Sequence, residues 1–271
     1  MSNQQKKEVI KHFNAWSAHY EAEVWGRDKY FHELLKKQVF STILNAVKQK
    51  ILELGVGPGI YLEQFILERH YVIGVDISIE MLRLSRKKLK TKGYDIVNLL
   101  SADAEHLPFR RGVFDLVNCI EVLRHLSHPY TTIWKVFREQ KRVITKQGSI
   151  LITIPNILFP LNLFSVFYYI IPRYLMRLFH KKIGFHSNHQ NISFPHFPVL
   201  YNEPEDHMYN LFFIKKLIHN SQLKISQLKG IFSFPACPKA LFSFVQKLDI
   251  ILGSSLWIFL AYSFFVKMRH L

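Results

Sequence analysis

The stretch Lys50 to Ile60, KILELGVGPGI, decides the fold of this chain. Its first five residues predict a buried strand, and Gly55, Gly57 and Gly59 then follow at alternate positions. Glycines placed there allow a tight turn and let a ligand lie directly on the backbone. A helix beginning near Ile60 would point its free amides at that ligand. The spacing G-x-G-x-G differs from the G-x-G-x-x-G of dinucleotide-binding chains, so an NAD-dependent oxidoreductase fits less well.

Strands and helices alternate after this stretch. Apolar runs predict further strands at 71–75, 96–100, 114–119 and 150–154, with helices between them at 60–69, 79–92 and 131–144. We expect the last of these helices to end near Gly148, which would cap it. Such alternation is typical of a parallel sheet with helices on both faces, a doubly wound, Rossmann-like α/β domain.

Composition restricts the possible classes of protein. The chain has 271 residues, of which 49% are hydrophobic, enough for a packed core. Its two cysteines, Cys119 and Cys237, are far apart and lack metal-type spacing, so we expect a reducing compartment and no disulfide framework. The first sixteen residues are polar and carry no secretory signal core. These features predict a cytoplasmic protein.

The formal net charge of +16 favours anionic partners such as a membrane surface, nucleic acid or an acidic metabolite. The basic run at 83–92 is typical of a solvated helix face. No RNA- or DNA-binding motif accompanies the charge. We therefore do not expect a nucleic-acid partner, and a membrane surface is the alternative that the charge leaves.

Asp76 lies at the end of the second predicted strand, about twenty residues past the glycines, where a carboxylate can accept both ribose hydroxyls of an adenosine group. The alternative is a structural role, as a helix N-cap beside Ser78.

A third motif, SADAEHLPF at 101–109, is followed by the strand that begins Phe114-Asp115-Leu116-Val117. The ordered set over residues 50–155 resembles the class I S-adenosylmethionine-dependent methyltransferases, in the methyltransferase type 11 and quinone-biosynthesis-like group. The resemblance implies S-adenosylmethionine as cofactor and a seven-stranded sheet whose last strand, at 261–268, is antiparallel.

The same resemblance assigns roles to individual residues. It places Asp103 and Ala104 at the adenine, Met81 packed against it, and Glu53 near the methionine amino group. Tyr20 resembles a tyrosine that closes over the cofactor, although a half-buried helix tyrosine is an equal alternative. The full predicted cofactor set is Tyr20, Glu53, Gly55, Gly57, Gly59, Asp76, Ile77, Met81, Asp103, Ala104 and Cys119.

Two histidines are candidate general bases for methyl transfer. His125 follows the fourth strand, beside the switch point where open α/β sheets bind ligands, and could instead be structural. His207 lies in a D-H-x-Y stretch that in relatives often lines the acceptor pocket. Quinone-biosynthesis relatives carry E-x-x-E-H where this chain has Glu121-x-x-Arg124-His125. Because an arginine there would repel a metal ion, we predict no metal site.

The chain divides into four predicted parts: an N-terminal helical cap at 1–48, the cofactor-binding core at 49–156, an apolar insertion or lid at 157–206, and a C-terminal part at 207–271 that completes the sheet. The apolar stretches at 157–172 and 250–266 are shorter than a membrane-spanning helix. An apolar segment with basic flanks at 157–182 suits either a membrane-interface helix or a lid over an apolar pocket.

These features predict methyl transfer to a small acceptor, apolar and lipid- or quinone-like. Methylation of a soluble or sugar-linked metabolite is the alternative within enzymes. A non-catalytic, membrane-associated protein that binds S-adenosylmethionine is the alternative outside them.

Overall fold

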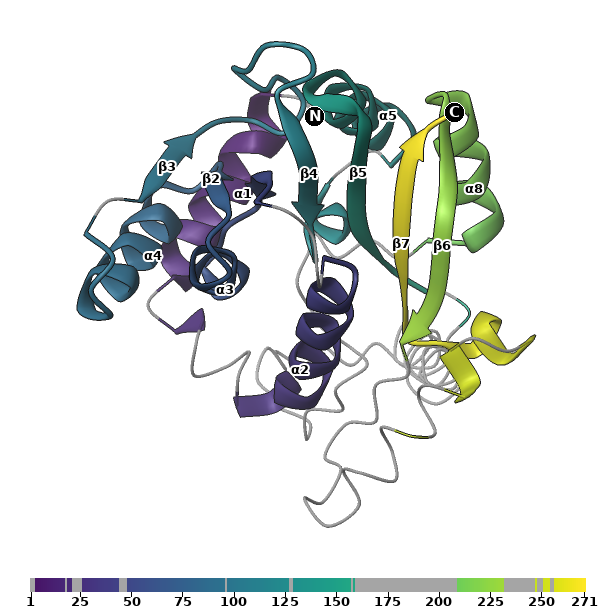
Figure 1. Ribbon diagram of the computed structural model, residues 1–271, viewed down its shortest axis with the longest axis horizontal. Coiled ribbons are helices and arrows are strands. Elements are labelled where there is room, and N and C mark those ends of the chain that lie inside the picture. The colour runs from purple at the N-terminus through teal and green to yellow at the C-terminus, as the bar shows by residue number, and fades with distance from the viewer. Residues whose placement is uncertain are drawn as a thin grey trace, which may run out of the picture.

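Seven strands form one sheet in the described part of the chain (Figure 1). The computed structural model describes residues 3–17, 19–20, 26–43, 48–95, 97–126, 129–156, 158, 209–231, 247, 251–253 and 256–271. The strand order is β3-β2-β1-β4-β5-β7-β6. The strands are β1 Lys50–Leu54, β2 Tyr71–Asp76, β3 Asn98–Ser101, β4 Phe114–Cys119, β5 Ile144–Pro155, β6 Leu223–Ile231 and β7 Ser263–His270.

The pairing directions confirm the predicted sheet. Strands β1 to β5 pair in parallel, whereas β7 runs antiparallel to both of its neighbours, β5 and β6. The last strand is therefore the antiparallel one, and all the other strands share one direction. Their carboxyl ends meet at one edge of the sheet, where ligands bind in open α/β folds.

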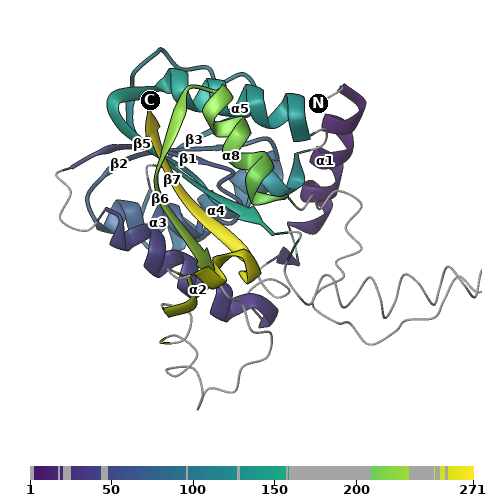
Figure 2. The ribbon, with the colours of Figure 1, turned by 90° about the vertical axis from the view of Figure 1, so that its right-hand side faces the viewer.

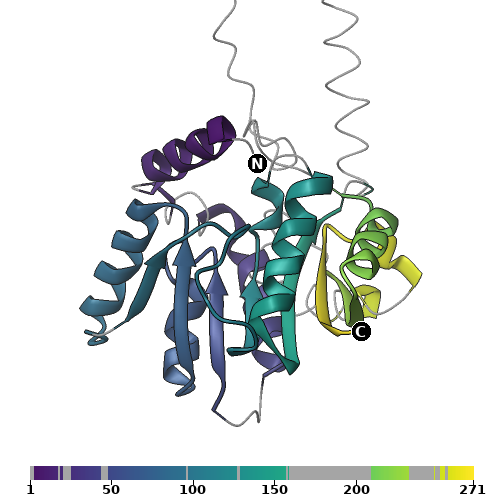
Figure 3. The same ribbon diagram turned by 90° about the horizontal axis from the view of Figure 1, so that it is seen from above.

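Helices cover both faces of the sheet. They are α1 Asn3–Trp16, α2 Gly26–Ser41, α3 Ile60–Leu67, α4 Ile79–Thr91, α5 Pro129–Val143 and α8 Leu211–Asn220, with short 3₁₀ helices η2 Leu123–His125 and η5 Leu256–Leu260. Figure 2 shows α5 and α8 on one face, and α2 and α3 on the other. In Figure 3, α1 lies beside α4 at one end of the sheet.

The apolar runs of the sequence become strands because both of their faces are buried. In β1, Ile51 packs in the core beneath α2 and α3, and its neighbour Leu52 packs in the core beneath α5 and α8. Both side chains are fully buried, and burying such a side chain contributes about 1.5–3 kcal/mol. A strand covered on both sides needs no polar alternation, which is why its sequence reads as continuously apolar.

Helix α5 ends within one residue of the predicted Ile144, but the prediction that Gly148 caps it is wrong. Helix α5 ends at Val143, and β5 begins with the next residue. Gly148 lies where the β4–β5 register shifts, between the pairs Phe114–Ile144 and Leu116–Ser149. A Cβ atom at Gly148 would lie 3.1 Å from the carbonyl oxygen of Phe114. The glycine therefore serves an irregularity in the strand pairing and not a helix cap.

Most of the predicted insertion at 157–206 lies outside the described residues, so its role as a lid or interface helix stays a prediction. Within the described residues, no helix is long and apolar enough to cross a membrane.

Candidate cofactor site

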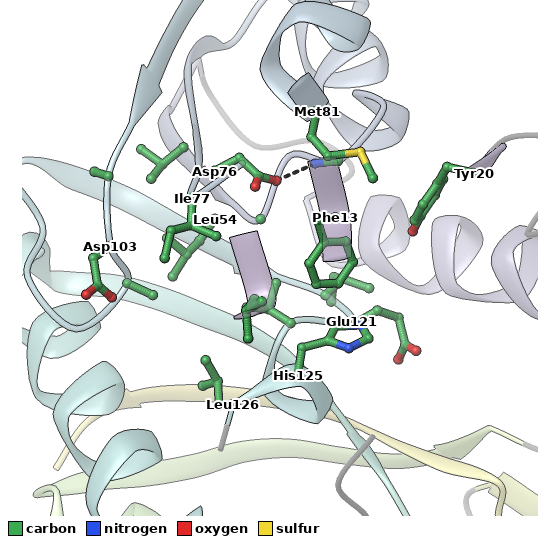
Figure 4. A pocket seen from close by; sticks show the side chains of 18 residues that line it. Phe13, Tyr20, Leu54, Asp76, Ile77, Met81, Asp103, Glu121, His125 and Leu126 are labelled. Carbon is green, nitrogen blue, oxygen red and sulfur yellow. Dashed lines mark hydrogen bonds between the residues drawn. The ribbon is translucent and has the colours of Figure 1, made fainter. Parts of the chain in front are cut away.

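A pocket of about 120 Å³ opens at the carboxyl edge of the sheet (Figure 4). Its floor comes from the loops that follow β1, β2, β3 and β4, and its cover comes from α1 and the residues just after it. In Figure 4, Asp103 and Tyr20 lie at opposite ends, with Asp76 between them. Nine residues predicted from the sequence line this pocket: Tyr20, Gly55, Gly57, Asp76, Ile77, Met81, Asp103, Ala104 and His125.

The glycine loop after β1 depends on left-handed backbone. Gly57 has φ +51°, and a Cβ atom added to it would meet nothing within 4 Å. Its side of the loop is therefore open to the pocket, and a ligand could lie on the backbone there. Gly59 is the N-cap of α3 with φ +79°, and a Cβ atom there would collide with the Ser85 hydroxyl of α4. Gly59 thus permits close packing of helices and does not line the pocket.

The Asp76 carboxylate is held in place by backbone amides. Its Oδ2 accepts a hydrogen bond from Gly57 N at 2.9 Å, and its Oδ1 accepts one from Ser78 N at 2.9 Å. Burial raises the pKa of Asp76, and these backbone N–H groups oppose that rise. The cap of α4 is Ser78, whose Oγ accepts from Met81 N at 3.2 Å. Asp76 therefore joins the glycine loop to the turn after β2 and keeps oxygen lone pairs available to a ligand.

Helix α1 contacts the adenine end of the predicted site. Lys6 donates to Asp103 Oδ2 and forms an ion pair with Glu105 Oε1 at 3.1 Å. Burial alone would raise the pKa of Asp103, but the hydrogen bond from Lys6 holds it below its usual value. Farther along the helix, Ser78 Oγ donates to Asn14 Oδ1 at 2.7 Å. Polar contacts at two positions of α1, Lys6 and Asn14, therefore hold the helix across the pocket.

The predicted residues Glu53 and Cys119, unlike those above, do not line the pocket. The Glu53 side chain is buried beneath it and accepts a hydrogen bond from Asn118 Nδ2 at 2.8 Å. Burial raises the pKa of Glu53 well above its usual value. The thiol of Cys119 is fully buried among apolar side chains, and burial raises its pKa to about 12. Such a thiol is inert at neutral pH and acts as core.

The segment after β4 brings His125 into the pocket. Its ring packs edge-on against Phe13 of α1, with ring centroids 4.9 Å apart and planes at 82°. Glu121 has φ +59°, a strained backbone conformation for a residue other than glycine. Its Oε2 accepts a hydrogen bond from Arg124 at 2.7 Å, in an ion pair whose side chains are both mostly buried. Cation and carboxylate thus neutralise each other beside His125.

The second candidate base, His207, lies outside the described residues. Its near neighbour Tyr209 is buried, and the Tyr209 hydroxyl donates to the carbonyl oxygen of Leu123 at 3.0 Å. In the part of the chain that the structure covers, no group of three His, Cys, Asp or Glu residues could hold a metal ion.

Sequence reasoning missed the contribution of α1. Val9 and Phe13 line the pocket, one helical turn apart, and Lys6 lies on the same side of the helix. The signal was present as apolar residues spaced by four, continued by Trp16 and Tyr20, whose rings are 4.7 Å apart. Such spacing marks a buried helix face but does not tell core from ligand pocket.

Comparison with known proteins agrees with this geometry. A family model described as a methyltransferase domain matches residues 52–152, the segment that carries the glycine loop, Asp76 and Asp103. Residues 52–152 thus resemble a methyltransferase domain, as the order of their motifs predicts. It is 34% identical over 113 residues to the malonyl-[acyl-carrier protein] O-methyltransferase of Legionella pneumophila, covering 41% of this chain and 37% of that relative. It is 31% identical over 85 residues to the ubiquinone biosynthesis O-methyltransferase of Vibrio campbellii, covering 31% and 36%.

The matched part of this chain thus spans little more than a third of each of these two relatives. Among solved structures, it resembles the magnesium protoporphyrin IX methyltransferase of Synechocystis PCC 6803 with bound SAH. The TM-score is 0.63 at 15% identity, covering 98% of this chain and all of the other. At that identity the likeness establishes the fold.

Proposed function

We propose that this chain binds S-adenosylmethionine in the carboxyl-edge pocket and transfers its methyl group to a small-molecule acceptor. The observation that carries the proposal is the Asp76 carboxylate, fixed at the end of β2 by the N–H groups of Gly57 and Ser78. A carboxylate so held can accept two ribose hydroxyls without moving. The open face of Gly57 beside it leaves room for the adenosine and methionine portions.

The other lining residues suit the same cofactor. Met81 and Ile77 offer apolar surface near Asp76, and Asp103 offers a carboxylate for the adenine amino group. S-adenosylmethionine carries a positive sulfonium, and the Asp76 carboxylate in the pocket lining favours a cationic ligand over an anionic dinucleotide. The buried Glu53 lies in β1, just before the glycine loop, and we propose that it is near the amino group at the methionine end of the cofactor.

We infer that α1 moves when the cofactor enters. Pockets for ligands of this size have volumes of about 300–1,000 Å³, whereas the closed pocket measures about 120 Å³. Val9 and Phe13 of α1 form part of its wall, and the contacts of Lys6 and Asn14 hold the helix in place. An outward movement of α1 would enlarge the pocket, and return of the helix would exclude water from the bound cofactor.

Methyl transfer asks mainly for alignment. The acceptor atom attacks the methyl carbon with its lone pair, the carbon–sulfur bond breaks, and sulfur keeps the bonding electrons, which neutralises the sulfonium. A hydroxyl or amine acceptor then loses a proton. His125, at the pocket wall against Phe13, is the side chain that we propose accepts it.

The acceptor that we favour is apolar. Phe13, Val122 and Leu126 surround His125 with hydrocarbon, which suits a ring or an acyl chain better than a sugar. The two relatives named above act, by their names, in ubiquinone biosynthesis and on malonyl groups of a carrier protein, so the shared domain alone does not select an acceptor. We also propose contact with a membrane surface, because the segment at 157–182 is apolar with basic flanks.

Transfer of label tests the proposal. Purified protein is incubated with S-adenosylmethionine carrying a labelled methyl group and an extract of the source cells, which is then split into organic and aqueous phases. Label in the organic phase supports an apolar acceptor, and label in the aqueous phase alone supports a soluble metabolite. If neither phase gains label while the cofactor binds, the protein is a non-catalytic binder.

A matched pair of variants then tests the role of His125. His125→Gln should lower the transfer rate by about 10²–10⁴-fold while leaving the Kd for S-adenosylmethionine nearly unchanged. His219→Gln removes an exposed histidine of α8 and should have no effect on either quantity. Equal rates for wild type and His125→Gln would remove His125 from the mechanism.

A further inference from the structure

A second pocket lies at the opposite edge of the sheet from the cofactor site. Its volume is about 770 Å³, within the usual range for small-ligand sites. The segment before β1, the first residues of β4 and β5, the last residues of β7 and the end of α2 form its walls. We name it the amino-edge pocket, and its cationic lining residues are Lys48, Lys146, Lys267 and Arg269.

The charges of the amino-edge pocket are unbalanced. Against its four cations stands the carboxylate of Asp115, whose Oδ2 already accepts a hydrogen bond from Lys50 N at 2.9 Å. Among the described residues, none of the four cations forms an ion pair with a carboxylate. The Lys48 ammonium instead lies 4.1 Å from the ring centroid of Tyr71.

Strand β7 places positive charges together despite their repulsion. Lys267 and Arg269 are two residues apart and so project from the same face. The register of β6 sets Lys224 directly opposite Arg269, and like charges at directly opposed positions destabilise a sheet. Lys267 is also partly withdrawn from water, and this burial, with the charge of Arg269, lowers its pKa. Lys48, Lys146 and Arg269 are exposed, so the free energy that a bound anion would recover is greatest at the partly buried Lys267.

We propose that the amino-edge pocket binds a phosphate-bearing anion, in a site separate from the cofactor pocket. Four cations that line one pocket suit a ligand with two or more negative charges, and the planar guanidinium of Arg269 can hold two phosphate oxygens at once. The Ser149 hydroxyl accepts from Arg269 Nε at 3.3 Å, so its own hydrogen can point to the ligand. S-adenosylmethionine, a sulfonium cation, does not meet this description. The site therefore implies a second ligand.

Calorimetric titration of the full chain with inorganic pyrophosphate, at about 0.15 M ionic strength, tests the proposal. The wild-type protein should bind pyrophosphate saturably, with a rise in Tm. The double variant Lys267→Gln/Arg269→Gln should weaken binding at least tenfold, about the effect of losing one charge-assisted hydrogen bond. The matched control Lys215→Gln/Lys216→Gln removes the same charge from the exposed face of α8 and should change the affinity less than twofold.

Lys146→Gln provides a second variant at an exposed position that carries little risk for folding, and it should also weaken pyrophosphate binding. Equal losses in the β7 and α8 double variants would mean that net charge alone attracts the anion, and would overturn the proposal. Absence of saturable binding to the wild type would overturn it as well. Neither result depends on S-adenosylmethionine, so this experiment does not test the proposed methyl transfer.

Vesicles identify the source of the phosphate. Sedimentation with phosphatidylglycerol vesicles that is abolished by Lys267→Gln/Arg269→Gln and competed by pyrophosphate would assign the site to a lipid headgroup. Pyrophosphate binding that depends on the same residues, without vesicle binding, would assign it to a free phosphate compound. Phosphatidylcholine vesicles, which have no net charge, serve as the control.

Discussion

Replacing Asp76 with Asn changes one oxygen for a nitrogen at the centre of the cofactor pocket. In the wild type, both carboxylate oxygens accept backbone N–H groups, from Gly57 and from Ser78. The amide has one acceptor oxygen and would present an NH₂ group to the other N–H. One charge-assisted hydrogen bond is therefore lost, worth about 1.5–3 kcal/mol, and the gain from no longer burying a charge offsets part of it. We expect a net destabilisation of about 1–2 kcal/mol.

Asp76→Asn should affect cofactor affinity more than stability. The amide can accept from one ribose hydroxyl but not from both, so a second bond of about 1.5–3 kcal/mol is lost on binding. This corresponds to a Kd for S-adenosylmethionine about 10–150 times higher. Calorimetric titration measures the Kd, and a thermal melt of the same sample shows that the variant is folded.

Asp115→Asn is the matched control. Asp115 also accepts a backbone N–H, from Lys50, but lies at the other edge of the sheet. We expect its Kd for S-adenosylmethionine to equal that of the wild type. A folded Asp76→Asn protein whose Kd stays within about twofold of the wild type would refute the assignment of the ribose to Asp76.

Three further substitutions test the surroundings of the pocket. Glu53→Gln should raise the free energy of unfolding by about 0.5–2 kcal/mol at pH 7, because the raised pKa of Glu53 makes its ionised form costly in the folded protein above pH 4.5. This gain, followed by Tm, should vanish below pH 4.5. The same variant should weaken cofactor binding. Lys6→Met should destabilise by about 1 kcal/mol at neutral pH, and the deficit should shrink as pH falls through the depressed pKa of Asp103; a deficit independent of pH would contradict the ion pair. Gly59→Ala should lower the free energy of unfolding by at least about 1–2 kcal/mol, because alanine is strained in the left-handed backbone conformation of Gly59. The double variant Gly59→Ala/Ser85→Ala should recover part of this loss, because it removes the hydroxyl that the new Cβ atom would meet. Chemical denaturation of the single and double variants measures that recovery.

The central strands β1 and β4 could be predicted from the sequence, because they are short and buried on both sides. Ile51 and Leu52 lie in separate cores, so the strand that holds them is apolar throughout and bounded by turn residues. The role of Gly148 could not be found in this way. Gly148 is typical of both a helix cap and a strand irregularity, and only the pairing of β4 with β5 distinguishes the two.

The sequence predicts those parts of the pocket in which one loop both lines the pocket and has glycines with positive φ. Gly57 falls in such a loop, and a hydrogen bond joins it to Asp76, the last residue of β2. Lys6 and Phe13 were not found because their partners, Asp103 and His125, are about a hundred residues away in sequence. Cys119 was among the predicted cofactor residues, but the two-residue period of a strand turns its side chain into the core.

A crystal structure of the protein with S-adenosylhomocysteine tests the central claim most directly. The account predicts both ribose hydroxyls within hydrogen-bond distance of the Asp76 carboxylate, the adenine between Met81 and Asp103, and α1 displaced from its position across the pocket. A ligand bound elsewhere, or bound here with its ribose away from Asp76, would contradict the account.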